Sequence, residues 1–261
     1  MHEIWQSMAE DVAFPRSSLP GRDGNPRSVK YPLRPPRIQH TMKITLFAVL
    51  TTMALGAATH AADGWIQMFN GKDLSGWKSN AATEDQPDQK AGVFTAKDGE
   101  LVVKGGRTHL FYVGADGKAA FKNFEFKAKV KTTPGSNSGI YFATRFENKG
   151  WPTAGYECQV NATHSDRKKT GGLYAVADVM DKAPHQDGEW FDYSIKVDGK
   201  HIVIAINGKV TTDWTEPADW DPAKSLNNMA GRKLGEGTIA IQGHDPKSTI
   251  YYKDLFIKPL P

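Results

Sequence analysis

The feature that most constrains the fold of this chain is a period-two alternation of apolar and polar residues. In NFEFKAKVKT (123–132), apolar residues at even positions alternate with charged residues at odd positions. Successive side chains of a β-strand point to opposite faces, so this pattern predicts a strand with one face in a core. Similar segments are 100–105, 108–113, 138–145, 155–160, 191–200, 201–208, 237–242 and 249–258. Turn signals separate them and no long stretch has helical periodicity, which predicts an all-β antiparallel two-sheet sandwich.

The first 61 residues differ in composition from the rest of the chain. Residues 1–41 contain six prolines and little apolar periodicity, as disordered segments do. After Met42 come a lysine, an apolar run and small residues ending at Ala61, which is the order of a secretory signal peptide. We therefore expect a signal peptide at 42–61, an exported periplasmic or extracellular protein, and one domain over 62–261. Residues 1–41 are then either the product of a misplaced start codon or a genuine long leader.

Charge and cysteine content exclude several classes of protein. Without residues 1–61, 26 basic and 25 acidic side chains remain, a net charge of +1. No basic stripe marks a nucleic-acid surface, and no later apolar run approaches the about 20 residues of a membrane span. The single cysteine, Cys158, allows no intramolecular disulfide, and its place among apolar neighbours predicts a buried thiol. The oligomeric state is not indicated.

Two predicted strands carry polar groups of a kind that binds sugars. GYECQV places Glu157 and Gln159 opposite its apolar side chains, and SGIYFATR places Tyr141 and Arg145 on one face. If these faces coincide, they bring together a carboxylate, an amide, an aromatic ring and a cation, which can hydrogen-bond and stack on a sugar. For any one of these residues alone, a solvated strand face is the alternative interpretation.

Further polar candidates lie in later segments. In NATHSDRKKTGGLYAV, Asn161, Lys169 and Tyr174 are candidates for substrate binding. His164 and, just after a predicted strand, His244 could act as general acid or base, or as metal ligands. Their spacing matches no compact metal motif, so the sequence leaves open whether a divalent metal ion takes part.

A long polar loop is expected at residues 215–236. It contains Trp220, which is a further candidate for substrate binding. A loop of this length in a compact domain is often functional, and the alternatives are a wall of the site or an ordered surface loop. Residues 78–92 are predicted to form a second polar loop.

The blocks of sequence also resemble a known family in their order along the chain. GWIQMFNGKDLSGWK (64–78) resembles the opening of the 3-keto-disaccharide hydrolase family, and SNSGIYFATR, GYECQV, TGGLYAV and GTIAIQGHDPKSTIYYKDLFIKPL follow in the family's order. The resemblance covers residues 64–261. It implies a jelly roll of the concanavalin A-like lectin/glucanase type, with the site on the concave sheet face. Phe191 stands where family members often have Asn, so a role tied to that Asn is in doubt.

The resemblance implies cleavage of glycosides that already carry a ketone at C3 of the sugar. Such a ketone acidifies the C2 proton, so a base and an oxyanion stabiliser suffice. A retaining glycosidase instead needs two carboxylates roughly 5 Å apart. On the strand of Glu157 the next same-face residues are Gln159 and Asn161, which supply no second carboxylate.

These points together predict an exported enzyme that acts on 3-keto-glycosides or disaccharides by C2 proton abstraction, elimination and hydration. Glu157 is the expected base or substrate clamp, His244 or His164 the alternative acid or base, and Arg145 the partner of the enolate or of a hydroxyl. One alternative is a carbohydrate-binding module without catalysis, because aromatic rings and amides suffice for binding. Another is an ordinary endo-glycanase.

Overall fold

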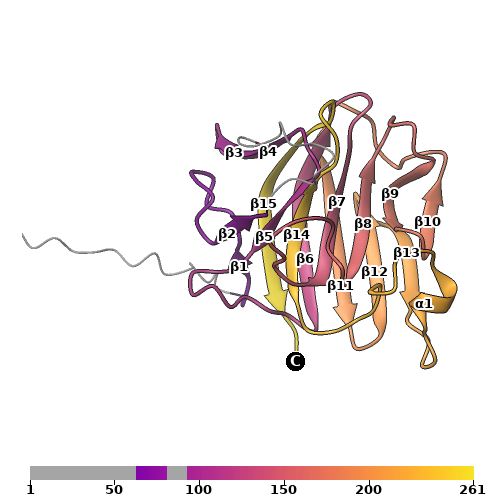
Figure 1. Ribbon diagram of the computed structural model, residues 1–261. Helices are drawn as coiled ribbons and strands as arrows, with labels where there is room; N and C mark the ends of the chain where they lie inside the picture. Colours follow the sequence, from indigo (N-terminus) through magenta and orange to yellow (C-terminus); the bar gives the residue numbers. More distant parts are fainter. Residues whose placement is uncertain (1–62, 81–92) are drawn as a thin grey trace, which may run out of the picture. The chain divides into compact units, whose positions relative to one another are not determined.

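The computed structural model describes residues 63–80 and 93–261, which form fifteen strands and one short helix (Figure 1). The expected leader, the expected signal peptide and most of the expected 78–92 loop lie outside the described residues. All strand pairs are antiparallel and fall into two sheets. The predicted all-β, two-sheet antiparallel sandwich is therefore confirmed.

The first sheet has eight strands. Their order is β13 (Lys209–Thr215), β12 (His201–Ile206), β11 (Phe191–Asp198), β6 (Phe124–Thr132), β15 (Thr249–Pro259), β4 (Glu100–Lys104) and β3 (Phe94–Lys97), with β1 (Ile66–Gln67) paired to β15. The expected Asn-Gly turn joins β12 to β13, and both Asn207 and Gly208 have positive φ angles (49° and 75°). A two-residue turn of this conformation matches the twist of the strands that it joins.

The second sheet has seven strands and carries the candidate site. Their order is β10 (Ala177–Met180), β9 (Lys168–Leu173), β8 (Tyr156–Asn161), β7 (Asn137–Thr144), β14 (Thr238–Gly243), β5 (Thr108–Tyr112) and β2 (Trp77–Ser79). The predicted segments 138–145, 155–160 and 237–242 are thus the three adjacent central strands β7, β8 and β14.

The apolar faces of both sheets form one core. On β8, Tyr156, Cys158 and Val160 are all buried in it, as the alternation predicts. Cys158 is a free thiol in this core, and burial raises its pKa well above the usual value. A role for this thiol as a nucleophile is therefore disfavoured. Phe191, the departure from the family pattern, is also buried in the core.

The other face of the seven-stranded sheet is also largely buried, although several of its side chains are polar. A separate small apolar cluster of Phe111, Tyr141 and Ala240 lies there. Glu157 and Gln159 flank it, and both are almost fully buried. Buried polar side chains need hydrogen-bond partners, either from the protein or from a ligand, so this face is a candidate for the functional site.

Two irregular features shape this face. Ala143 near the end of β7 has φ of 52°, and the register with β14 shifts between Thr238 and Ala240. A bulge of this kind re-aims the side chains that follow it. The chain between β13 and β14 is the second feature: residues 216–237 form no strand and contain the four-residue helix α1 (Pro222–Ser225). No helix within the described ranges is long and apolar enough to cross a membrane.

Candidate active site

A cavity of about 590 Å³ lies over the polar face of the seven-stranded sheet. Its floor comes from β7, β8 and β14. Its walls come from residues 151–153 and 155 and from residues 228–232 of the segment between β13 and β14. The volume is in the range of small-ligand sites. The 216–237 segment is therefore a wall of the cavity, which was one of the two interpretations that the sequence allowed.

Glu157 forms the centre of the floor. Its Oε2 accepts hydrogen bonds from the Tyr141 hydroxyl (2.7 Å) and from Nη2 of Arg232 (2.9 Å). Its Oε1 accepts a bond from Nε2 of Gln242 (3.0 Å). The side chains of Glu157 and Arg232 are only 7% and 8% exposed, so this ion pair is buried. Glu157 is therefore part of a built site rather than of a solvated strand face.

The strands place these groups by register. Tyr141 on β7 is the direct cross-strand partner of Glu157 on β8. Gly139, one same-face position earlier on β7, leaves the space that the carboxylate occupies, because a Cβ there would lie 2.6 Å from Oε1 of Glu157. Gln242 follows Ala240 on β14, opposite the buried Ile239 and Ile241, so its place on this face could have been found from the alternation.

Arg232 supplies the cation of the site and comes from the long segment. Burial alone would lower its pKa, but Tyr141 and Glu157 raise it above the ordinary arginine value, so the guanidinium stays charged. Its positive centre also lies 5.2 Å from the centre of the Tyr141 ring. The loop around Arg232 has no periodicity, and no sequence signal marked this residue.

Arg145, the expected cation, lies elsewhere. The structure leaves its side chain exposed and outside the cavity lining. The expected face shared with Tyr141 fails because the positive φ of Ala143 interrupts the alternation and β7 ends at Thr144. The positive group beside Glu157 is therefore Arg232 and not Arg145.

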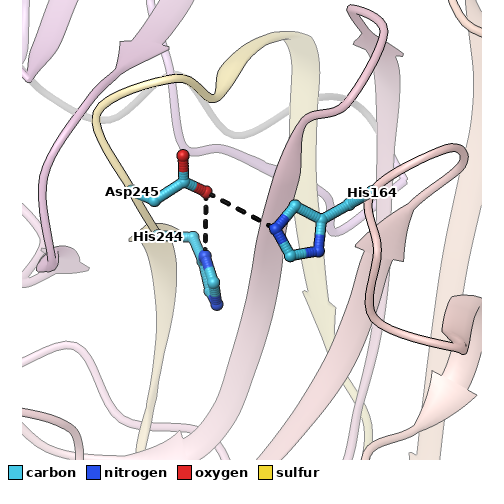
Figure 2. Close-up of side chains that lie close together, drawn as sticks. All are labelled: His164, His244 and Asp245. Atoms are coloured by element: carbon cyan, nitrogen blue, oxygen red, sulfur yellow. Dashed lines mark hydrogen bonds and ion pairs between the residues drawn. The ribbon is translucent and has the colours of Figure 1, made fainter.

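His244 lines the cavity and is oriented by the next residue, Asp245 (Figure 2). Nδ1 of His244 lies 3.0 Å from Oδ2 of Asp245, while its Nε2 lies 3.3 Å from the amide nitrogen of Asn137. Burial raises the pKa of Asp245, but hydrogen bonds from Ser248 and His244 outweigh it and leave the pKa below its usual value. An ionised Asp245 holds the proton of His244 on Nδ1, so Nε2 is unprotonated, accepts the Asn137 amide N–H and carries the lone pair that a base needs.

His164 approaches the same oxygen of Asp245 as His244 does, as Figure 2 shows. Its Nδ1 accepts a hydrogen bond from the backbone N–H of Asp166 (3.1 Å), so its proton is on Nε2, 4.0 Å from Oδ2 of Asp245. Burial and the charge of His244 lower the pKa of His164, which favours the neutral ring. His164 does not line the cavity.

His164, His244 and Asp245 are also the group that could hold a metal ion among the described residues. Their ligand atoms lie within 4.8 Å of one another. A histidine ligates through an unprotonated nitrogen, and the Asp166 N–H keeps the proton of His164 on the nitrogen that faces Asp245. The three residues, as arranged, therefore fit proton transfer better than metal ligation.

The remaining predicted residues divide into two sets. Gln159 and Tyr174 line the cavity, and the Tyr174 hydroxyl donates to Oδ2 of Asp166 (3.2 Å), which also lines it. Asn161 and Lys169 lie outside the cavity lining.

Asn161 and Lys169 bond the loop between β8 and β9 instead. The Asn161 amide donates to the carbonyls of Asp166 and Lys168, and Nζ of Lys169 donates to those of His164 and Asp166 (both 2.7 Å). Both side chains are buried. The structure therefore places these two residues in support of the loop rather than at the cavity.

Trp220 also lies outside the cavity lining, and its Nε1 donates to the carbonyl of Arg232 (2.7 Å). Trp151, which the sequence analysis missed, does line the cavity and is 41% exposed, with its ring beside those of His109 and His244. An exposed ring at a cavity wall is suited to stack on a sugar.

His109 gives a testable pH dependence of stability. It is fully buried, and neither ring nitrogen has a hydrogen-bond partner among the described residues. Burial and the charge of Arg232 lower its pKa to about 3, against a smaller opposite effect of the Gly150 carbonyl. Below pH 6.5 the unfolded chain takes up a proton that the folded chain does not, so stability falls as pH falls from 6.5 towards 3, by about 1.4 kcal/mol per pH unit.

We expect the His109→Phe variant to lack this contribution. Urea unfolding at about pH 7.5 and about pH 4.5 would show its free energy of unfolding falling by about 3 kcal/mol less than that of the wild type. Val210→Thr, at an exposed position of β13, changes no titratable group and is the control that should keep the wild-type dependence. An unchanged slope in His109→Phe would mean that the His109 ring is protonated in the folded state.

Comparisons with known proteins agree with the resemblance. The model of the 3-keto-alpha-glucoside-1,2-lyase-like domain family matches residues 64–258. A 3-keto-disaccharide hydrolase of Bacteroides thetaiotaomicron is 24% identical over 237 residues, covering 76% of this chain and 79% of that protein. Crystal structures of two candidate glycosyl hydrolases from Parabacteroides distasonis ATCC 8503 superpose with TM-scores of 0.63 and 0.56. Their identities are 24% and 25%, and the matches cover 77% and 75% of this chain and 95% and 99% of theirs. The chain therefore belongs to the 3-keto-alpha-glucoside-1,2-lyase-like domain family.

Proposed function

We propose that the protein cleaves 3-keto-glycosides in the cavity above Glu157, by proton abstraction at C2, elimination and hydration. The observation that carries this proposal is the presence, in one cavity, of a carboxylate-supported histidine and a buried arginine. These are the base and the positive group that the chemistry of a C3 ketone requires. Membership of the family and the name of the Bacteroides relative support the same substrate class.

His244 is the proposed base. Its Nε2 faces the cavity unprotonated and removes the proton from C2, while Asp245 stabilises the imidazolium that forms. The electron pair of the C2–H bond forms a C2–C3 double bond, and the negative charge moves to the former ketone oxygen. Arg232, which uses only part of its five N–H donors on Glu157 and the Gly155 carbonyl, stabilises this oxyanion.

Elimination and hydration then complete the reaction without a redox change. The C3 ketone re-forms, a C1–C2 double bond forms, and the C1–O bond breaks. The leaving oxygen takes up the proton held by His244. Water then adds its oxygen to C1 and a proton to C2, which releases the 3-keto sugar. The overall change is hydrolysis.

Glu157 is better suited to be a clamp than the base. Its two oxygens already accept three hydrogen bonds, one of them from a cation, so most of their acceptor positions are occupied by the protein itself. Two buried amide oxygens on the same floor, Oδ1 of Asn137 and Oε1 of Gln242, have no partner among the described residues. A small rotation of either amide towards the cavity would let a sugar hydroxyl donate to it.

The test is to incubate the purified protein with a 3-keto-glucoside and with its unoxidised parent, and to identify products by mass spectrometry. We expect cleavage of the keto sugar only, and in D₂O the released 3-keto sugar should carry deuterium at C2. Treatment with a chelator should leave the rate unchanged, because the His164 tautomer disfavours a metal ligand.

Each other outcome contradicts a part of the proposal. Cleavage of the unoxidised parent would indicate an ordinary glycanase. Binding of either sugar with no cleavage would indicate a carbohydrate-binding module. Loss of activity with chelator, restored by a divalent ion, would show that the described arrangement of His164 changes when a metal binds.

A further inference from the structure

A second buried carboxylate, Glu216, lies outside the cavity and has no place in the proposed reaction. Its side chain is fully buried, at the point where the long segment leaves β13. Oε2 of Glu216 accepts hydrogen bonds from the Tyr156 hydroxyl (2.8 Å) and from the backbone N–H of Leu234 (2.7 Å). Oε1 pairs with the ammonium group of Lys200.

These bonds join three parts of the chain that are distant in sequence. Tyr156 is on β8 directly before Glu157, whereas Leu234 is two residues after Arg232. Burial raises the pKa of Glu216, but the bonds from Lys200, Leu234 and Tyr156 outweigh it and leave the pKa below its usual value. The Glu216 carboxylate is therefore an ionised acceptor, and its bond to Leu234 fixes one end of residues 228–234, the loop that carries Arg232.

Trp220 fixes the same loop at a second point. Its Nε1 donates to the carbonyl of Arg232 itself (2.7 Å). The Trp220 ring packs against Trp214 (5.4 Å between centroids), and Trp214 packs against Tyr156 (5.7 Å). Glu216 thus contacts Tyr156 directly, and Trp220 is connected to Tyr156 through Trp214.

The other side of Arg232 is held by backbone contact. The N–H of Gly155 donates to the carbonyl of Gly231 (2.9 Å), and a Cβ at Gly231 would lie 1.7 Å from the Thr153 carbonyl oxygen. The backbone on both sides of Arg232 is therefore fixed, at Gly231 and at Leu234. The Arg232 side chain therefore extends into the cavity from a backbone that is held on both sides.

We propose that Glu216 is a positioning residue that acts through Leu234 and Tyr156 to hold the Arg232 guanidinium against Glu157. Its effect on catalysis rests on the proposed function, in which Arg232 stabilises the enolate oxygen. Because the enolate charge develops only towards the transition state, a displaced guanidinium lowers kcat more than it raises KM.

The first test is the Glu216→Gln variant, which keeps the shape of the side chain and removes its charge. We expect kcat for the 3-keto-glucoside to fall about tenfold with KM within about twofold of the wild type. Tyr156→Phe removes one donor of the network and should give a smaller loss in the same direction, which serves if Glu216→Gln does not fold. Glu236→Gln, at an exposed carboxylate of the same segment, is the matched control and should match the wild type.

A double-variant comparison separates positioning from a general structural effect. If Glu216 acts through Arg232, Glu216→Gln has no further effect on kcat in an Arg232→Met background. If the losses multiply instead, Glu216 does not act through Arg232 and the proposal is overturned.

A measurement without substrate tests the positioning of Arg232 separately from the proposed function. NMR of protein labelled with ¹⁵N-arginine would follow the hydrogen exchange of the buried Arg232 guanidinium, whose Nη1 and Nη2 donate to the Gly155 carbonyl and to Glu157 in the wild type. We expect exchange about tenfold faster in Glu216→Gln and unchanged in Glu236→Gln. Unchanged exchange in Glu216→Gln would overturn the positioning role even if no 3-keto-glycoside is ever cleaved. Faster exchange in a protein that cleaves none would leave it standing while the proposed function fails.

Discussion

The His244→Gln variant is expected to lower kcat for 3-keto-glycoside cleavage by about a thousandfold and to change KM by no more than a few-fold. General-base catalysis contributes about 10²–10⁴ to a rate, and Gln can hydrogen-bond like the neutral imidazole but cannot take up a proton. Steady-state kinetics would measure the loss. The rate at which the variant exchanges the C2 hydrogen of an added 3-keto sugar in D₂O should fall with it, because that exchange needs only the base.

His164→Gln is the matched comparison for this prediction. His164 also lies beside Asp245, but its ring does not line the cavity and its Nδ1 is used by the Asp166 N–H. We expect it to lose less than about tenfold in kcat. A larger loss in His164→Gln than in His244→Gln would reverse the assignment of the base.

The Arg232→Met variant is expected to lose both activity and stability. Without Arg232, the carboxylate of Glu157 stays buried without its cation, and breaking a buried pair in this way costs about 3–5 kcal/mol. Loss of the oxyanion partner should lower kcat by about 10²–10³. Urea unfolding and steady-state kinetics on the same preparation would measure the two effects.

Two further variants separate the two effects of Arg232. In Arg232→Met/Glu157→Gln no buried charge is left unpaired, so most of the free energy of unfolding should return while kcat stays low. Arg145→Met changes an exposed arginine outside the cavity and should resemble the wild type in both measurements. If Arg145→Met were inactive and Arg232→Met active, the pairing with Glu157 would have no catalytic meaning.

The strands could be predicted because burial on one face imposes alternation on the sequence. Tyr156 and Cys158 enter the core and Glu157 faces the other way, as the pattern required. The proximity of Tyr141 and Glu157 could also be predicted, because strands that are close in sequence often pair, and these two pair directly.

The cation and the supporting residues could not be predicted in the same way. One residue with positive φ, Ala143, reverses the direction expected for Arg145, and alternation contains no information about such a bulge. Arg232 comes from a segment with no periodicity, and its place depends on contacts with distant chain. Asn161 and Lys169 have the chemistry of sugar ligands, but their polar groups bond backbone carbonyls, and sequence does not distinguish the two uses.

Gly139 makes the identities of two positions on neighbouring strands depend on each other. The carboxylate of Glu157 occupies the volume that a side chain at residue 139 would need. There is space for only one side chain at these two positions. A larger residue at position 139 would therefore clash with the carboxylate at position 157 unless that side chain became shorter or moved. In this family, a sequence with a larger residue at the position of Gly139 would be expected to carry a shorter or differently placed acid. A glycine at the position of Gly139 together with a glutamate at the position of Glu157 therefore predicts this site in sequences for which no structure exists.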